Sequence, residues 1–344
     1  MNARHGLSRA FRPMLAGAAA AVCFAAFAPP IGAAEWKPGK PITIIVTWAA
    51  GGSTDQVTRI LAGDLEEALG QKVVVVNQPG ASGSIGIKSV IDAPRDGYTW
   101  AAGAAGDLGT YRLLGMLDTD ITDWHLYFDV ANVAVVSVNA ATPYKNFDDL
   151  IKAFKSRPGK IAVATAGQSS SGHLAIEVLR RALQFDYKHV TYDGGNPAVI
   201  ATVGGETEVV TQLAVEQVDM LRAGRLRALA VLSDEPLKID GLGDVPPVTR
   251  WIPGFNLPGN YFGVWLPRGV PDDVVLTLNR VWKDRIAKSR KLPQYAASRG
   301  AQFAPHYGLE ALRRVIPYIQ NAAAVYHEAG KTKLDPVDLG ILKP

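Results

Sequence analysis

The sequence predicts an α/β fold with a largely parallel sheet, because strand-like and helix-like segments alternate along it. Two similar series of segments support this prediction. Each contains an apolar strand, small residues, a glycine, hydroxyl side chains and then a helix, in the stretches IIVTWAAGGSTD and IAVATAGQSSSGH. The chain has 344 residues, 48% of them hydrophobic, which is enough to build the cores of two domains.

The first series begins after residue 41. Runs such as KVVVVN are rich in β-branched residues, which favour strands. The helix that follows the first strand ends at Gly70, a residue type that commonly closes helices. Glycine-rich stretches separate the later segments. We expect strands at 42–46, 72–77 and 98–102, and helices at 54–69 and 85–92.

The second series has the same alternation and ends in a mostly helical segment. We expect strands at 132–138, 160–164, 189–192, 209–213 and 226–232, and helices at 147–157, 174–183, 196–204 and 215–223. Residues 234–258 are rich in proline and predict an irregular segment. An apolar strand at 261–266 and helices at 272–285, 293–299 and 309–329 complete the chain.

The first 34 residues predict a secretory signal peptide. Three arginines precede an apolar, alanine-rich stretch at 14–27, and small residues follow, so cleavage is expected after Ala34. A membrane anchor is the alternative, but the stretch is shorter than the about 20 residues that a span requires. We therefore expect an exported protein in the periplasm.

The only cysteine, Cys23, lies inside this apolar stretch. Cleavage just before it, as in a lipoprotein, is disfavoured because Val22 suits that site poorly. A mature chain without cysteine excludes disulfides, thiol catalysis and Cys-ligated zinc. Removing three arginines leaves 33 basic against 32 acidic residues, and no basic run predicts nucleic-acid binding.

The glycine-containing turns before two helices are candidate anion sites. The first helical turn leaves backbone N–H groups unpaired, and the helix dipole makes that end partly positive. Glycines let a ligand approach the backbone, and hydroxyls such as Thr54 or those of 169–171 add donors. The alternative is plain helix capping, for which Ser, Thr and Asp are preferred. Two matched turns that face one cleft would favour binding.

Other candidate residues carry open alternatives. His173 begins a helix beside three serines and is either a packing residue or a donor to an anion. Trp48 belongs either to the core or to a cleft. The sequence has no G-x-S-x-G elbow, P-loop or H-E-x-x-H motif. These absences favour a binding protein over an enzyme, with no cofactor and no metal.

Several motifs, in order, carry a family resemblance. PITIIVTWAAGGSTDQVTRILAGDLEEALGQKVVVVNQPGASGSIG, APRDGYT, RPGKIAVATAGQSSSGHLAIEVL, AGRLRALAV and DVPPV together resemble the substrate receptors of tripartite tricarboxylate transporters, the Bug-type periplasmic receptors. The resemblance implies a two-lobe periplasmic binding protein fold with a ligand cleft between the lobes. It implies hinge strands near 133–139 and 261–266, one lobe at 35–136 plus 262–344, and the other at 137–261.

The resemblance also implies which residues bind the ligand. The family's Ala-Gly-Gly-x-Thr-Asp turn holds a carboxylate and corresponds to Ala50, Gly51, Gly52, Thr54 and Asp55. The Ser-Ser-x-His turn of the other lobe corresponds to Ser170, Ser171 and His173, with Gly172 as an extra residue. Trp48, Asp107, Ser169, Tyr192 and Asp193 complete the expected ligand-binding set.

Two departures from the family pattern bear on the ligand. Asp107 stands where relatives tend to have Ser or Thr, and Asp193 stands where Lys is frequent. If both face the cleft, each repels a ligand carboxylate by about 4 kcal/mol at about 4 Å and an effective dielectric near 20. We therefore hypothesise a ligand less anionic than citrate: a monocarboxylate, an aromatic one, or one with an amine or amide.

The predicted function is that of a periplasmic receptor which captures a small carboxylate and delivers it to membrane transporter subunits. We expect a monomer that undergoes hinge closure and catalyses no reaction. Two alternatives remain open. One is a sensory receptor that presents its ligand to a membrane kinase, and the other is a periplasmic hydrolase that uses His173 with a nearby serine.

Overall fold

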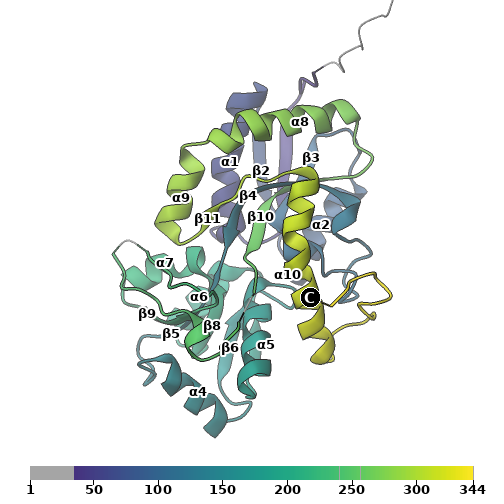
Figure 1. Ribbon diagram of the computed structural model, residues 1–344. Coiled ribbons are helices and arrows are strands. Elements are labelled where there is room, and N and C mark those ends of the chain that lie inside the picture. The colour runs from purple at the N-terminus through teal and green to yellow at the C-terminus, as the bar shows by residue number, and fades with distance from the viewer. Residues whose placement is uncertain (1–34, 240, 256, 344) are drawn as a thin grey trace, which may run out of the picture. The chain divides into compact units, whose positions relative to one another are not determined.

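The computed structural model describes residues 35–239, 241–255 and 257–343. The predicted signal peptide at 1–34 and Cys23 lie outside this part of the chain. The described residues form two β-sheets with helices packed around them (Figure 1). The α/β class predicted from the alternation of segments is confirmed.

The first sheet has six strands in the order β11-β4-β10-β3-β1-β2. Their bounds are β1 Ile42–Val46, β2 Val73–Asn77, β3 Thr99–Ala104, β4 Trp124–Asn132, β10 Asn260–Pro267 and β11 Gln302–Phe303. The second sheet has five strands in the order β7-β6-β8-β5-β9. Their bounds are β5 Ala134–Asn139, β6 Ala162–Thr165, β7 Lys188–Thr191, β8 Val209–Leu213 and β9 Leu226–Val231.

The helices lie close to the predicted positions. They are α1 Ser53–Leu69, α2 Ser84–Asp92, α3 Ala105–Leu108, α4 Phe147–Ser156, α5 Ser171–Leu183, α6 Gly195–Val203, α7 Ala214–Arg222, α8 Asp272–Asp284, α9 Lys291–Arg299 and α10 Gly308–Glu328. Short 3₁₀ turns lie at Ala81–Gly83, Ile121–Asp123, Val248–Arg250 and Ile286–Lys288. Among the described residues, no helix combines the length and the apolar character that crossing a bilayer requires.

Both sheets are mixed, so the expectation of a largely parallel sheet is wrong. β1 pairs in parallel with β2 and β3, and β6 does so with β7 and β8. β10 and β5 instead run antiparallel to both of their neighbours. The cause is connectivity, because β5 and β10 each receive the chain from the other sheet and therefore run in the opposite direction.

One long strand, β4, has no counterpart among the predicted elements. The strand expected at 132–138 is β5, and Val133 alone separates it from β4 in the first sheet. Asp129 and His125 interrupt the apolar pattern of β4, although Asp129 is fully buried in the structure. A buried acid inside a strand is rare, so the sequence pattern does not indicate a strand there.

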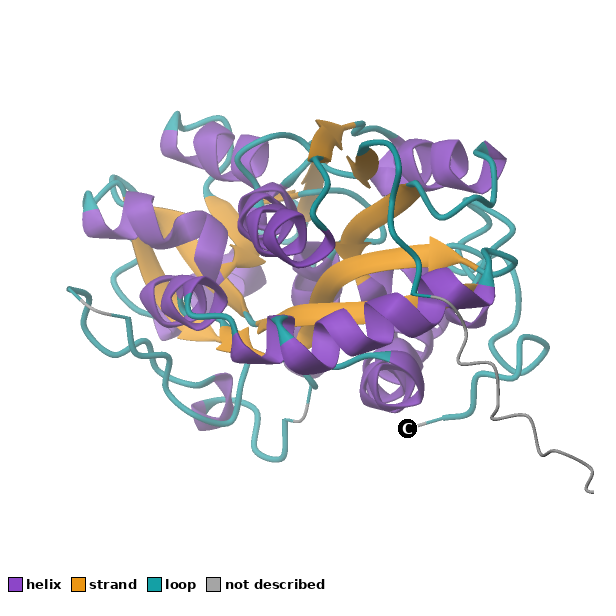
Figure 2. Cartoon of the chain, turned by 90° about the horizontal axis from the view of Figure 1, so that it is seen from above, coloured by secondary structure: helices purple, strands orange, loops and turns teal. Residues whose placement is uncertain are grey.

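The strands of the first sheet are covered on both faces, which explains their almost continuous apolar sequences. Ile44 and Val46 pack in the core cluster that includes Val57 of α1, whereas Ile45 points to the other face and packs with Ile87 of α2. Figure 2 shows helices on both sides of the strands. Because helices cover both faces, the turns that follow the strands lie at the ends of the strands, outside the helix layers.

Candidate functional site

Turns that follow strands of the two different sheets lie in contact. The N–H of Ala49, after β1, donates to the carbonyl of Asp193, after β7, at 3.1 Å. The N–H of Gln168, after β6, donates to the hydroxyl of Ser82, after β2, at 2.9 Å. The carboxyl ends of these parallel strands therefore face each other, which is where open α/β sheets bind ligands.

A small cavity lies between these turns. Its volume is about 20 Å³, which is room for about one water molecule. Twelve residues line it: Trp48, Ser53, Thr54, Asp107, Ala166, Ser170, Ser171, Gly195, Gln212, Leu213, Glu216 and Phe262. Five of the residues expected to bind ligand are among them, and they come from both sheets: Trp48, Thr54, Asp107, Ser170 and Ser171. Larger hollows elsewhere on the surface include none of the expected residues.

The amino end of α1 is occupied by a side chain of the protein itself. Oε1 of Glu216, in the first turn of α7, accepts from the N–H of Ser53 at 3.1 Å and from its hydroxyl at 2.9 Å. A carboxylate is the group that the partly positive amino end of a helix favours. Glu216 thus makes the contact that the sequence analysis assigned to a ligand carboxylate.

Further hydrogen bonds hold the Glu216 carboxylate in place. Oε2 accepts from the N–H of Leu213 at 3.3 Å. The amide of Gln212, oriented to satisfy both of its partners, donates to Oε2 at 2.9 Å and accepts from the N–H of Ala166 at 2.6 Å. Burial raises the pKa of Glu216, and the hydrogen bonds from Ser53 lower it in part. A Cβ on Gly195 would lie 2.1 Å from this carboxyl group, so the glycine makes room for it.

Asp107 and Thr54 bring buried polar atoms to the cavity that have no hydrogen-bond partner. Asp107 is 3% exposed, and its Oδ1 has no partner among the described residues. The same holds for Oγ1 of Thr54, which is 1% exposed. Burial and the charge of Glu216 raise the pKa of Asp107 well above its usual value. A buried polar atom without a hydrogen-bond partner costs free energy. Asp107 Oδ1 and Thr54 Oγ1 are therefore suited to bind a polar group that enters the cavity.

The amino end of α5 supplies donors from the second sheet. Ser170 is its N-cap, and its hydroxyl accepts from the N–H of His173 at 3.3 Å. The hydroxyl of Ser171 accepts from Asn260 Nδ2 at 2.9 Å. In the described part of the chain, the N–H groups of Thr54, Ser171 and Gly172 donate to no protein acceptor. Free donors from α1 and α5 therefore lie at one cavity.

The rest of the first turn is used for local structure. Gly51 N–H donates to Asp55 Oδ2 at 2.9 Å, and Asp55 pairs with Arg59 at 2.8 Å. Gly52 is the N-cap residue of α1, and Ala50 is exposed. Neither Asp55 nor Ala50 lines the cavity. Asp55 lies in the first turn of α1, where an acid complements the helix dipole.

Three expected residues of the second sheet also lie away from the cavity lining. The side chain of Asp193 is exposed, and only its carbonyl meets the first sheet. Tyr192 packs against a core cluster that contains Val199 of α6. The hydroxyl of Ser169 donates to the carbonyl of Ser82 at 3.2 Å. Of the two acids proposed to repel a carboxylate, only Asp107 faces the cavity.

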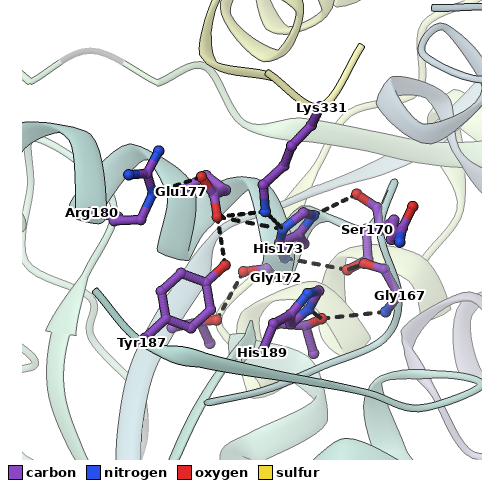
Figure 3. A network of polar contacts seen from close by, with 12 residues as sticks. Gly167, Ser170, Gly172, His173, Glu177, Arg180, Tyr187, His189 and Lys331 are labelled. Carbon is purple, nitrogen blue, oxygen red and sulfur yellow. Dashed lines mark hydrogen bonds and ion pairs between the residues drawn. The ribbon is translucent and has the colours of Figure 1, made fainter. Parts of the chain in front are cut away.

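His173 belongs to a polar network that also includes Ser170 of the cavity lining (Figure 3). Its Nδ1 lies 2.6 Å from the carbonyl of Gln168, and its Nε2 lies 3.0 Å from Nζ of Lys331. A carbonyl can only accept and an ammonium can only donate, so Nδ1 carries the proton and Nε2 accepts. The ring also stacks on His189 at 4.2 Å between centroids. His173 is buried and does not line the cavity.

Glu177 is the centre of this network and is 1% exposed. It accepts from Tyr187 at 2.6 Å, from Arg180 at 2.9 Å and from Lys331 at 2.9 Å. Burial by itself raises the pKa of Glu177, but the hydrogen bonds from Tyr187 and Lys331, together with the positive charge of Lys331, outweigh it and hold the pKa far below its usual value. Since Lys331 follows α10 and Glu177 lies on α5, the pair ties these two helices together.

We expect Lys331→Met to lower the free energy of unfolding by about 2 kcal/mol, because a buried carboxylate loses its ammonium partner. Chemical denaturation followed by circular dichroism measures this change. The control is Lys37→Met, since Lys37 is exposed and forms no ion pair among the described residues. Equal stability of the two variants would contradict a stabilising role for the network.

The sequence analysis missed several lining residues, above all Glu216. A signal for it existed, because Glu216 lies in the first turn of a helix that directly follows a strand, as Thr54 does. Glycine-rich turns are the features that mark the other candidate helix ends, and β8 runs into α7 without a glycine. Gln212 and Phe262 carry no local signal, since each becomes part of the cavity only through the pairing of distant strands.

Comparison with known proteins gives a consistent result. Residues 57–306 match the family model described as tripartite tricarboxylate transporter family receptor. The chain is 30% identical over 281 residues to the protein BugT of Bordetella pertussis, covering 80% of this chain and 85% of BugT. It also resembles the structure of the periplasmic binding protein BugD, with 27% identity, a TM-score of 0.77, and coverage of 86% and 100% of the two chains.

Two further similar structures contain dicarboxylates. An R. palustris protein with adipate is 27% identical, with a TM-score of 0.77 and coverage of 85% of this chain and 98% of that chain. MatC from Rhodopseudomonas palustris with bound malate is 25% identical, with a TM-score of 0.72 and coverage of 86% and 98%. These neighbours are two-lobe binding proteins and not enzymes, and the predicted fold is confirmed.

Proposed function

Since the chain belongs to the tripartite tricarboxylate transporter receptor family, we propose that it captures a small carboxylate between its two sheets and delivers it to a membrane transporter. The observation that supports this proposal is the convergence of α1 and α5. Both helices bring their amino ends to one cavity, and among the described residues the N–H groups of its lining residues Thr54 and Ser171 have no protein acceptor. Such donors bind a carboxylate without a lysine or arginine.

Ligand entry requires the two lobes to separate. A cavity of about 20 Å³ is too small for a carboxylate of several heavy atoms. The resemblance implies lobes at 35–136 with 262–344 and at 137–261. Because β5 lies wholly in the second sheet and β10 wholly in the first, we propose that the chain crosses between the lobes near Val133 and just before β10. Hinge opening admits the ligand, and a ligand that contacts both lobes stabilises the closed state by its higher affinity for that state.

The proposed location of the protein is the periplasm. Relatives such as BugD are periplasmic binding proteins, and the first 34 residues have the pattern of a cleaved signal peptide. We propose that the mature chain acts as a monomer and that the transporter is its membrane partner. Loss of uptake of the bound carboxylate in cells lacking the protein would support delivery, and unchanged uptake with a lost transcriptional response would favour a sensory receptor.

We expect a small carboxylate at 100 times its dissociation constant to stabilise the fold by about 2.7 kcal/mol. A thermal-shift screen of mono-, di-, tri- and aromatic carboxylates tests this expectation. Gly52→Val should abolish the shift, because a side chain at this N-cap would press on the cavity-lining carboxylate of Glu216, whose Oε1 would lie 3.6 Å from its Cβ. The backbone of Gly52 is extended, and a Cβ there makes ordinary contacts, the nearest being 3.4 Å from Ala49 O.

The control for this variant is Gly243→Val. A Cβ at Gly243 meets no heavy atom within 4 Å, and the residue is exposed. Gly243→Val should keep the full ligand-induced shift in melting temperature. Gly52→Val should lose this shift, and without ligand it should unfold at nearly the same temperature as the parent. A screen in which no carboxylate shifts the parent protein would contradict the proposal.

A further inference from the structure

The cavity between the two sheets is lined by two carboxylates and by no basic side chain. Asp107 comes from α3 beside the first sheet, and Glu216 comes from α7 beside the second. None of the twelve lining residues is lysine, arginine or histidine. An anion entering this space with no positive charge of its own would meet two like charges.

The two acids differ in whether their carboxylate oxygens have hydrogen-bond partners. Glu216 accepts from Ser53, Leu213 and Gln212, so both of its oxygens have protein partners. Asp107 is 3% exposed, and its Oδ1 has no partner in the described part of the chain. A buried carboxylate oxygen without a donor requires one, and no described residue donates a hydrogen bond to this oxygen.

The remaining surface of the cavity suits an organic cation. Trp48 and Phe262 line it, and aromatic faces attract ammonium groups. Thr54 Oγ1, also without a partner, can accept a further hydrogen bond from such a group. The free N–H groups at the amino ends of α1 and α5 remain available for a carboxylate.

We propose, on the basis of the proposed function, that the captured carboxylate also carries a cationic nitrogen, as an amino acid or another amino carboxylate does. Its ammonium group pairs with Asp107 and lies beside Glu216, and its carboxylate meets the N–H groups of Thr54 and Ser171. The ligand is thus a small zwitterion, in which each charge lies near protein groups of opposite polarity.

The electrostatics of the empty cavity agree with this assignment. Burial and the neighbouring Glu216 raise the pKa of Asp107 well above its usual value, which means that the surroundings destabilise its charged form. An ammonium group would oppose this effect, because a positive charge in contact with a carboxylate favours the ionised form. A dicarboxylate would leave both acids without a counter-charge.

The test is a set of matched probes in a thermal-shift assay, followed by calorimetry of the compounds that bind. Each set contains an amino carboxylate, the dicarboxylate, the plain monocarboxylate and the diamine of one chain length, from two to six carbons, with the common α-amino acids added. We expect an amino carboxylate to bind at least about tenfold more tightly than the matched dicarboxylate and monocarboxylate.

The outcomes separate this inference from the proposed function. Equal or tighter binding of the dicarboxylate or monocarboxylate would overturn the cationic nitrogen and leave carboxylate capture standing. Binding of diamines alone would support the cationic nitrogen and overturn carboxylate capture. No binding by any member of any set would overturn both.

Variants of Asp107 provide an independent readout. Asp107→Asn should weaken binding of the amino carboxylate by about tenfold or more, with no loss for the matched monocarboxylate. Its melting temperature without ligand should not fall, since the amide keeps the shape of a neutral acid. The control, Asp338→Asn, changes an exposed acid outside the lining and should bind as the parent does. Unaltered affinity of Asp107→Asn for the amino carboxylate would overturn the proposal.

Discussion

Replacing Asp129 with asparagine is expected to raise the free energy of unfolding by about 3 to 5 kcal/mol at about pH 9, with little change near pH 4. Asp129 lies in β4 and is fully buried. Its Oδ1 accepts from the N–H of Val130 at 2.7 Å, and its Oδ2 has no partner among the described residues. Burial raises the pKa of Asp129 to about 8 from 3.8.

The sign of the effect follows from proton binding. Between about pH 4 and pH 8 the folded protein keeps a proton on Asp129, whereas the unfolded chain releases it. The folded state then binds more protons, so stability falls as the pH rises through this window and stays low above it. Asparagine has the shape of the neutral acid and never ionises. The stability of the variant should therefore not fall in this way as the pH rises.

Urea denaturation of parent and variant at about six pH values measures the difference. Asp338→Asn serves as the control, because Asp338 is exposed and its replacement should leave the pH profile unchanged. If the free energies of unfolding of the parent and of Asp129→Asn change in parallel from pH 4 to pH 9, Asp129 is not held neutral in the folded protein.

Gly172→Ala is expected to lower the free energy of unfolding by about 3 kcal/mol, at the upper end of the range for overpacked positions. A Cβ on Gly172 would lie 2.0 Å from the carbonyl oxygen of Thr211 in β8. The obstructing atom belongs to the backbone, so a change of rotamer cannot relieve the clash. The hydroxyl of Thr211 also donates to the carbonyl of Gly172 at 2.8 Å, which fixes α5 against β8.

The same substitution should weaken ligand binding, because the amino end of α5 must move away from the cavity to accommodate the methyl group. Circular dichroism in urea measures the loss of stability, and calorimetry with the compound found in the screen measures binding. Gly243→Ala is the matched control, since no heavy atom lies within 4 Å of a Cβ there. Equal stability of these two alanine variants would show that the backbones of α5 and β8 can move apart to accommodate the methyl group without cost.

The sequence alone determined the alternation of strands and helices, because periodicity and caps are local properties. β1 has the predicted bounds, and α1 begins one residue before its predicted start. The same local rules placed Thr54, Ser170 and Ser171 at the ends of strands, where a cavity of this fold would lie. They left Trp48 open between core and cleft, and Asp107 was expected from the family resemblance. The family resemblance, carried by ordered motifs, is likewise a property of the sequence and is confirmed by the comparisons.

Only the tertiary structure decided which of these residues meet and what they meet. Helix α1 and Glu216 are far apart in the chain, and no local rule indicates that a carboxylate from α7 will occupy the amino end of α1. The direction of β5 and β10 and the burial of Asp129 depend in the same way on the chain crossing between sheets. The physical reason is that capping and periodicity act within a few residues, whereas burial, charge pairing and cavity lining arise from contacts between distant segments.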